Sequence, residues 1–313
     1  MQTLQYTLKR LAFMLPTFLL VAIIVFLLVR ALPGDPAIAL AGDRASNADL
    51  DAIRERLGLN EPLVVQFFIF ISNLVRGDLG HSILLRGPVL DIIIARLPTT
   101  LFLTVYAIAL SVAIACPLAL WAAMRKGQRV DNVIRSLFQV GLSMPVFYIG
   151  LLLLTLFAAQ LRWFPVGGYG ESFFDRAYHL FLPAVTVAFY TSAIIMRNLR
   201  SAIIDVLEAD YVEFARAKGL PNRVVVTDHV LRNTLISTVT LIGLSIGNLM
   251  SGTLVTETVF AVPGLGRLML EAIFARDYPL IQGLTLTFAL LVSLVFLITD
   301  LAQSWIDPRV ELK

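Results

Sequence analysis

The sequence predicts an all-α, polytopic membrane protein with six transmembrane helices and with its N- and C-termini in the cytoplasm. Of its 313 residues, 58% are hydrophobic and 15% are charged, and the mean hydropathy is +0.82. Such a composition is typical of a chain that lies mostly in lipid. Six apolar stretches reach the roughly 20 residues that a helix needs to cross the hydrocarbon core. Basic residues concentrate in alternate loops, which predicts the orientation.

The first predicted span is residues 11–31, directly after Lys9 and Arg10. A cleaved signal peptide is the competing interpretation, because Ala39–Ala41 has the small-x-small form of a cleavage site. The apolar stretch exceeds the roughly 7–15 residues of a signal-peptide core, and more spans follow it. We therefore interpret residues 1–31 as the N-terminus and a retained transmembrane helix.

Residues 32–97 are predicted to form an extracytoplasmic loop region, because glycine and proline interrupt them repeatedly. Within this region the apolar run Leu63–Val75 is too short for a comfortable crossing. We expect it to lie at the membrane interface or to pack on the spans. If it were a span, the orientation of every later loop would be inverted.

The remaining five spans are predicted within a permease core, residues 98–306. This core includes a cytoplasmic loop at 201–232, and residues 307–313 form a cytoplasmic tail. The five spans cover residues 98–124, 136–160, 180–199, 234–257 and 281–303.

The orientation follows from the positive-inside rule. With the N-terminus inside, all four lysines lie in the cytoplasm: Lys9, Lys126, Lys218 and Lys313. The short outer loops hold only four arginines: Arg162, Arg176, Arg267 and Arg276. This orientation places the most charged loop, Asp210–Arg232, in the cytoplasm.

The loop Asp210–Arg232 has the sequence signals of a helix, a tight turn and a second helix. Asp210 and Glu213 have the spacing of a capping box, which predicts a helix start near Tyr211. Gly219 can adopt the left-handed conformation that closes a helix, and Pro221 suits the first turn of the next one. The same signals fit a solvated loop that only joins two spans.

Helical spacing predicts that one face of the first short helix is aromatic and small. Tyr211, Phe214, Ala215 and Lys218 recur at intervals of three and four residues. Such a face suits a groove on a soluble partner.

The segment Glu213–Gly219 resembles the Glu-Ala-Ala loop of the membrane subunits of bacterial ABC importers. Phe214 replaces the first alanine of that pattern, and Arg232 stands where the family has proline. The segments Ala215–Leu220 and His229–Asn233 resemble the dipeptide, oligopeptide and nickel branch, although Ser237 stands near a position where that branch often has proline.

The resemblance extends over nearly the whole chain. Family-like segments occur at 33–36 (PGDP), 56–63 (RLGLNEPL), 77–82 (GDLGHS), 96–101 (RLPTTL), 260–268 (FAVPGLGRL), 276–283 (RDYPLIQG) and 307–309 (DPR). The resemblance implies an ABC importer permease fold and the first permease of a pair, multi-pass in the bacterial inner membrane. It also implies four partners besides the lipid bilayer: a second homologous permease, two cytoplasmic ATPases that carry ATP and Mg, and an extracytoplasmic binding protein.

In this family the cytoplasmic loop docks into a cleft on the ATPase. The resemblance therefore implies that the coupling residues are Asp210, Tyr211, Glu213, Phe214, Ala215, Arg216, Ala217, Lys218 and Gly219. The substrate class that it implies is di- or oligopeptides, with glutathione and nickel chelates as alternatives.

The sequence lacks the motifs of an enzyme. It contains no Gly-x-x-x-x-Gly-Lys-Ser/Thr phosphate loop, no GxSxG elbow and no HExxH pair. The single cysteine, Cys116, lies in an apolar run and offers no metal-ligand spacing. The net charge of +3 is too small and dispersed to indicate nucleic acid. We therefore expect no catalytic residue, cofactor or metal in this chain.

Polar residues within spans are the candidates for a translocation path. They are Ser143, Ser245, Asn248, Ser251, Thr253 and Glu257. Ser245, Asn248 and Ser251 recur every three residues on roughly one helix face. Helix packing is the alternative role for the uncharged residues, because small and polar side chains also join helices in lipid. Glu257 can instead fix the neighbouring PGLG loop, and Asp300 can reach headgroup water.

Two other classes of protein compete with this interpretation. A secondary transporter predicts ionisable residues at midspan and internal repeats, neither of which is clear here. A membrane scaffold would explain the charged loop but not the extended family resemblance.

Overall fold

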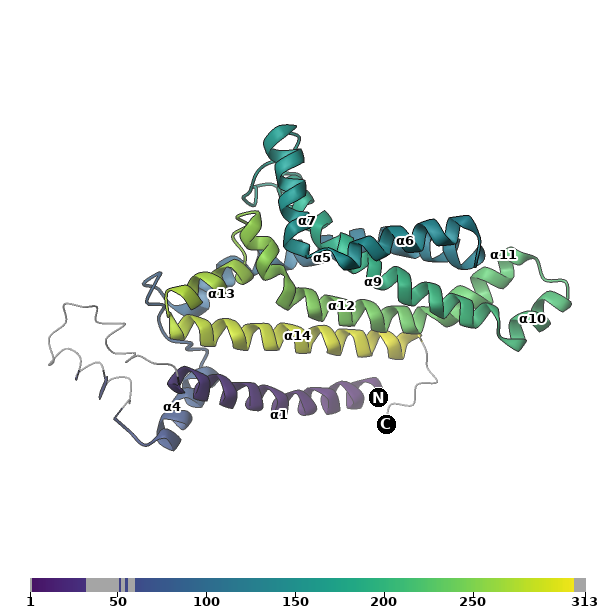
Figure 1. Ribbon diagram of the computed structural model, residues 1–313. Coiled ribbons are helices and arrows are strands. Elements are labelled where there is room, and N and C mark those ends of the chain that lie inside the picture. The colour runs from purple at the N-terminus through teal and green to yellow at the C-terminus, as the bar shows by residue number, and fades with distance from the viewer. Residues whose placement is uncertain (1, 32–50, 52–53, 56–59, 307–313) are drawn as a thin grey trace.

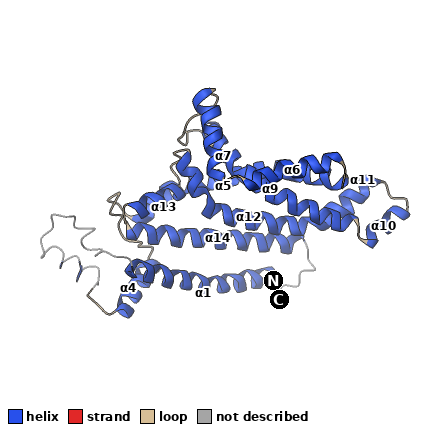
Figure 2. Ribbon diagram, viewed as in Figure 1, coloured by secondary structure: helices blue, strands red, loops and turns tan. Residues whose placement is uncertain are grey.

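The computed structural model describes residues 2–31, 51, 54–55 and 60–306, and every regular element in this part of the chain is helical (Figure 2). The predicted tail 307–313 and much of the predicted loop region 32–97 lie outside the described residues. The all-α class is confirmed for the part that is described.

Four long helices lie side by side, each in contact with the next (Figure 1). In spatial order they are α1 (Gln2–Ala31), α14 (Tyr278–Ile306), α12 (Arg232–Val259) and α9 (Phe181–Leu207). A fifth helix, α5 (Val89–Met124), packs along α9.

The contact between α5 and α9 is close because both helices contribute alanines to it. Ala107 and Ala119 of α5 have no exposed surface, and the same holds for Ala184 and Ala193 of α9. These residues belong to the two largest hydrophobic clusters of the molecule. In lipid, small side chains let two backbones approach and gain dispersion energy. The stable centre of the fold is therefore this helix pair.

The predicted span 136–160 is not one continuous helix, although its two parts together are apolar and long enough for one bent span. The chain forms α6 (Arg129–Ser143), then α7 (Val146–Leu153), which continues into a π-helix, Leu154–Gln160. The two parts are bent by 99°. Proline disfavours helical backbone in the residue before it, and Met144, which precedes Pro145, has extended angles. The α7 segment consequently projects away from the other helices (Figure 1).

Among the described residues, three helices are long and apolar enough to cross a membrane singly: α5, α9 and α14. Up to five crossings result if each of two bent helix pairs is one span. The apolar part of α1, Ala12–Leu28, is shorter than these. Six spans therefore stay a prediction.

The short apolar run at 63–75 packs on the first long helix, as expected. It forms α4 (Leu63–Val75). The ring of Phe26 on α1 lies 5.3 Å from that of Phe67 and 5.7 Å from that of Phe70. The Nε atom of Arg30 donates a hydrogen bond to Oε1 of Gln66 at 2.7 Å.

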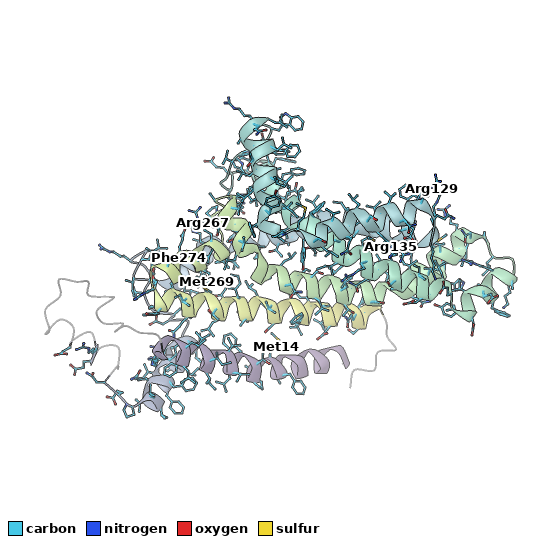
Figure 3. All side chains as sticks on the ribbon, viewed as in Figure 1. Met14, Arg129, Arg135, Arg267, Met269 and Phe274 are labelled. Carbon is cyan, nitrogen blue, oxygen red and sulfur yellow. The ribbon has the colours of Figure 1, made fainter. Side chains whose placement is uncertain are left out.

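Two segments that the sequence analysis identified separately meet at one end of the molecule. The carboxylate of Asp277, which has no exposed surface, accepts hydrogen bonds from Ser82 Oγ at 2.5 Å and from the backbone N–H of Leu84 at 2.9 Å. Between α12 and α14, α13 (Leu265–Phe274) lies at the same end, and it carries Arg267 and Phe274 (Figure 3). The charged loop lies at the opposite end.

Candidate functional site

The candidate coupling segment is a short helix that follows directly from the long helix α9. It is α10 (Asp210–Ala217), followed by α11 (Asn222–Val224) and a π-helix, Val225–Leu231, that leads into α12. The predicted order of helix, turn and helix is therefore present. The predicted capping box is absent, because Ala209 occupies the N-cap position and no side chain caps the helix. Asp210 and Glu213 instead lie in the first turn, where carboxylates favour the positive end of the helix dipole.

The turn after α10 contains the left-handed glycine that the sequence analysis predicted. Gly219 has a φ of +83°, which is the left-handed conformation expected at a helix end. Its N–H donates to the carbonyl of Arg216 at 2.9 Å. Pro221 lies at the N-cap of α11 rather than inside its first turn.

One face of α10 is exposed and aromatic. The side chains of Tyr211 and Phe214 are 46% and 61% exposed, and the Lys218 ammonium lies 4.5 Å from the Phe214 ring centroid. The predicted membership of Ala215 in this face is wrong, since Ala215 is only 5% exposed. It forms a small buried cluster with Val212 and Val225. The remaining residues of the predicted set are exposed: Asp210, Glu213, Arg216, Ala217, Lys218 and Gly219.

The buried side of α10 fixes the helix to its neighbours. Val212 and Val225 have no exposed surface, and Val206 of α9 packs against their cluster. On the other side, Asn233 at the start of α12 donates a hydrogen bond to the Tyr211 hydroxyl at 3.0 Å. The short helix α10 is therefore in contact with both α9 and α12. The sequence analysis missed Asn233 and Val212, although Val212 and Ala215 have helical spacing.

Two ion pairs join helices at the end of the molecule that carries α10. Lys126, after α5, pairs with Glu208, between α9 and α10. Asp131 of α6 receives two hydrogen bonds from Arg200 of α9, each 2.6 Å long, and a third from the N–H of Gly127. The Asp131 side chain has no exposed surface. Its partner lies far away in the sequence, so no local pattern could have indicated the pair.

The structure brings together two of the predicted path residues. Ser245 and Asn248 of α12 line a cavity of about 350 Å³ together with Tyr190 and Thr191 of α9 and Val146 of α7. Ser143, Thr253 and Glu257 do not line this cavity. Ser143 is exposed at the bend before Pro145, and its hydroxyl donates to the carbonyl of Gln139. Thr253 is fully buried, and the side chain of Ser251 lies outside the described residues.

Glu257 holds the start of α13 in place. Its side chain has no exposed surface; Oε1 accepts a hydrogen bond from Thr100 Oγ1 of α5 at 2.8 Å, and Oε2 accepts one from the backbone N–H of Arg267 at 2.9 Å. Thr100 Oγ1 in turn accepts from the N–H of Leu265 at 2.8 Å. A Cβ atom on Gly264 would lie 2.4 Å from the Glu257 carboxyl carbon. The geometry thus favours the role of fixing the PGLG loop.

The described residues contain no group of three or more His, Cys, Asp or Glu side chains that could hold a metal ion. What the arrangement can do is mechanical: an exposed aromatic helix at one end is connected by packed helices to a cavity between α7, α9 and α12.

Two family models match the chain. "Binding-protein-dependent transport system inner membrane component" matches residues 115–312, and the corresponding N-terminal model matches residues 3–104. The chain therefore belongs to this family, whose members are the permease subunits of ABC transporters rather than enzymes. The resemblance to ABC importer permeases of the peptide family is confirmed.

Curated relatives are similar along nearly their whole length. The chain is 39% identical to the glutathione transport system permease protein GsiC of Escherichia coli over 310 residues, which covers 99% of this chain and 100% of that protein. It is 39% identical to a protein of Escherichia coli K12 named as a probable D,D-dipeptide transport system permease, DdpB, with 93% of this chain and 92% of that protein covered.

Solved structures share the fold. The chain matches the MetNI methionine ABC transporter in an inward-facing conformation with a TM-score of 0.56, at 15% identity, over 69% of this chain and 96% of that one. It matches an amino acid ABC transporter with a TM-score of 0.52, at 18% identity, over 70% of this chain and 94% of that one. These matches identify the fold of an ABC importer permease.

Proposed function

We propose that this chain is the first of two permeases in an ATP-driven importer of the bacterial inner membrane. It spans the membrane six times, with both termini in the cytoplasm. The observation that carries this proposal is α10, which exposes Tyr211 and Phe214 while Val212 and Ala215 fix it to the rest of the chain. An exposed apolar helix face with a buried support suits docking into a groove of a partner.

The exposed residues of α10 and of the turn after it dock into a cleft on one of two cytoplasmic ATPases: Asp210, Tyr211, Glu213, Phe214, Arg216, Ala217, Lys218 and Gly219. Ala215 supports this surface from the buried side, together with Val212. ATP and Mg bind to those ATPases and not to this chain. When ATP closes the ATPase pair, α10 moves, and α9 and α12 move with it through the Val212 cluster and the bond between Tyr211 and Asn233. Two states of the helix bundle then alternate, and ATP binding favours the one that opens outward.

The substrate path runs between this chain and the second, homologous permease. Ser245 and Asn248 line the cavity between α7, α9 and α12, and Ser143 lies beside it at the helix bend. Ser251 is the next position of this three-residue repeat in the sequence, whereas Thr253 is fully buried and Glu257 holds the start of α13. An extracytoplasmic binding protein delivers the substrate to the outer side, where the loop region 32–97 meets it.

Di- and oligopeptides are the proposed substrates, because the similar proteins include permeases named for D,D-dipeptide and peptide transport. Glutathione is the leading alternative, since GsiC is equally similar, and nickel chelates are the next. The cavity is lined mostly by apolar side chains, among which a hydroxyl from Thr191, a phenol from Tyr190 and an amide from Asn248 can form hydrogen bonds with the peptide groups of a ligand.

Uptake by the reconstituted complex tests this function. The chain, co-purified with the products of its neighbouring genes in proteoliposomes, is expected to take up a dipeptide, an oligopeptide, glutathione or a nickel chelate only with ATP and the binding protein present. Uptake driven by an ion gradient without ATP would contradict the proposal.

The proposed orientation is tested with a single cysteine. Gln128, between α5 and α6, is exposed. In a Cys116→Ser background, the variant Gln128→Cys is expected to react with membrane-impermeant thiol reagents only in inverted vesicles. The Cys116→Ser protein without the second change gives the background labelling. Labelling of Gln128→Cys above this background in intact cells would overturn the proposed topology.

A further inference from the structure

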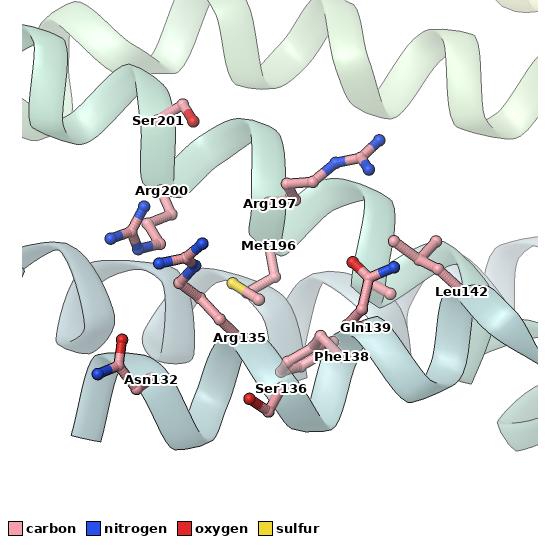
Figure 4. A pocket seen from close by; sticks show the side chains of 11 residues that line it. Asn132, Arg135, Ser136, Phe138, Gln139, Leu142, Met196, Arg197, Arg200 and Ser201 are labelled. Carbon is pink, nitrogen blue, oxygen red and sulfur yellow. The ribbon is translucent and has the colours of Figure 1, made fainter. Parts of the chain in front are cut away.

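A cavity of about 560 Å³ lies between α6 and α9 (Figure 4). Its position is toward the end of the molecule that carries α10, where Figure 3 shows Arg129 and Arg135 on α6. Three arginines line it: Arg135 from α6 and Arg197 and Arg200 from α9. The proposed transport function assigns no role to this cavity.

The cavity carries an excess of positive charge. Arg200 is neutralised by Asp131, whose two carboxylate oxygens it binds at 2.6 Å. Neither Arg135 nor Arg197 forms an ion pair with any carboxylate of the described residues. No acidic side chain lines the cavity. Asp131 also attracts Arg135 electrostatically, but no carboxylate of the described residues lies in direct contact with Arg135 or Arg197. Both guanidinium groups can therefore bind an anion, beside the polar side chains of Asn132 and Ser136.

The other part of the cavity is largely apolar, with the side-chain amide of Gln139 as its polar group. Along α6, Phe138 and Leu142 follow the polar residues, and Met196 faces them from α9 (Figure 4). In the proposed orientation Arg135 and Arg200 lie nearer the inner headgroups than Phe138 and Leu142, whereas the guanidinium group of Arg197 extends toward Gln139 and Leu142 (Figure 4). Along α6 the lining therefore changes from polar, at Asn132 and Arg135, to largely apolar, at Phe138 and Leu142, in the same direction as a phospholipid changes from headgroup to acyl chain.

We propose that this cavity binds an anionic phospholipid of the inner leaflet. Arg135 and Arg197 contact its phosphate, and one acyl chain lies along Phe138, Leu142 and Met196. Guanidinium groups bind phosphate oxygens through paired, charge-assisted hydrogen bonds, and basic cavities between helices on the cytoplasmic side suit lipid headgroups. A peptide fits less well, because its ammonium group would need an acidic partner and Asp131 is already bound to Arg200. The proposal rests on the proposed orientation of the chain.

The test measures lipid binding by the purified full-length chain without any partner. The chain in mild detergent is titrated with phosphatidylglycerol, and the bound lipid is counted by native mass spectrometry. We expect the double variant Arg135→Gln/Arg197→Gln to bind roughly tenfold more weakly or worse, because two charge-assisted contacts are lost. The matched control is Arg129→Gln, on the same helix but outside the cavity, which is expected to bind as the unchanged chain does.

Both altered arginines lack an ion-pair partner among the described residues, so the double variant is expected to keep its thermal unfolding midpoint. Equal lipid affinity in the double variant and the unchanged chain would overturn the proposal. Full displacement of the lipid by millimolar inorganic phosphate would reassign the cavity to a soluble phosphate, and displacement by a dipeptide would reassign it to the substrate path. Because the measurement needs neither ATP nor transport, its failure is separate from a failure of the proposed function.

Discussion

The substitution Phe214→Asp is expected to lower ATP-driven uptake at least about tenfold while the chain still folds and inserts. Phe214 is 61% exposed and provides the largest apolar surface on α10. If α10 docks into a cleft, a carboxylate at this position would have to be buried without a partner, which is strongly unfavourable. The packing of α10 itself should survive, because Val212 and Ala215 provide it.

The measurement is uptake and ATP hydrolysis by the complex in proteoliposomes. The matched control is Phe174→Asp in α8 (Phe173–His179), where an 83% exposed phenylalanine lies before α9 rather than after it. Loss of the ATPase subunits from the purified Phe214→Asp complex would locate the defect at docking. Undiminished uptake by Phe214→Asp would show that α10 is not the coupling element.

Much of the fold could be predicted, because the length of an apolar stretch can be read directly from consecutive residues. Stretches such as 98–124 and 281–303 lie within observed helices, α5 and α14. The bend at Pro145 could not be predicted from hydropathy, because the residues from 136 to 160 form one nearly continuous apolar run. Proline occurs inside α5 as well, at Pro98 and Pro117, without breaking that helix. Whether a proline bends a span depends on the neighbouring helices, and these are set by contacts far apart in the sequence.

The position of the candidate site could be predicted from the sequence, but the contacts that hold it to the other helices could not. Gly219 indicated the end of the short helix, because a left-handed residue closes a helix within its last turn. The helix also begins near the predicted residue, although the capping box of Asp210 and Glu213 that predicted this start does not form. The side of α10 that is buried depends on Val225, which lies in the following helix. The ion pair between Asp131 and Arg200 joins α6 and α9 and has no local signature. Contacts between residues that are distant in sequence could therefore be found only from the structure.

The second large effect is expected from Glu257→Ala, which should lower the free energy of unfolding by about 3 kcal/mol. The carboxyl group accepts hydrogen bonds from Thr100 and from the N–H of Arg267, and all of it is buried. Alanine leaves these donors without a partner and leaves space beside Gly264. Each unsatisfied buried donor costs roughly 1–3 kcal/mol, and lipid offers no water to replace the lost acceptor.

The effect should be visible as a lower thermal unfolding midpoint of the purified chain in detergent. Glu257→Gln keeps one acceptor oxygen and is expected to give an intermediate value. The matched control is Glu271→Ala on α13, where a 43% exposed carboxylate pairs only with Arg267, and such surface pairs contribute about 1 kcal/mol or less. If Glu257→Ala and Glu271→Ala had the same midpoint, Glu257 would not be what holds α13 to α5. If Glu257→Ala kept its midpoint and lost only uptake, the residue would act in the translocation path instead, since a group that merely fixes the PGLG loop cannot be removed without loosening it.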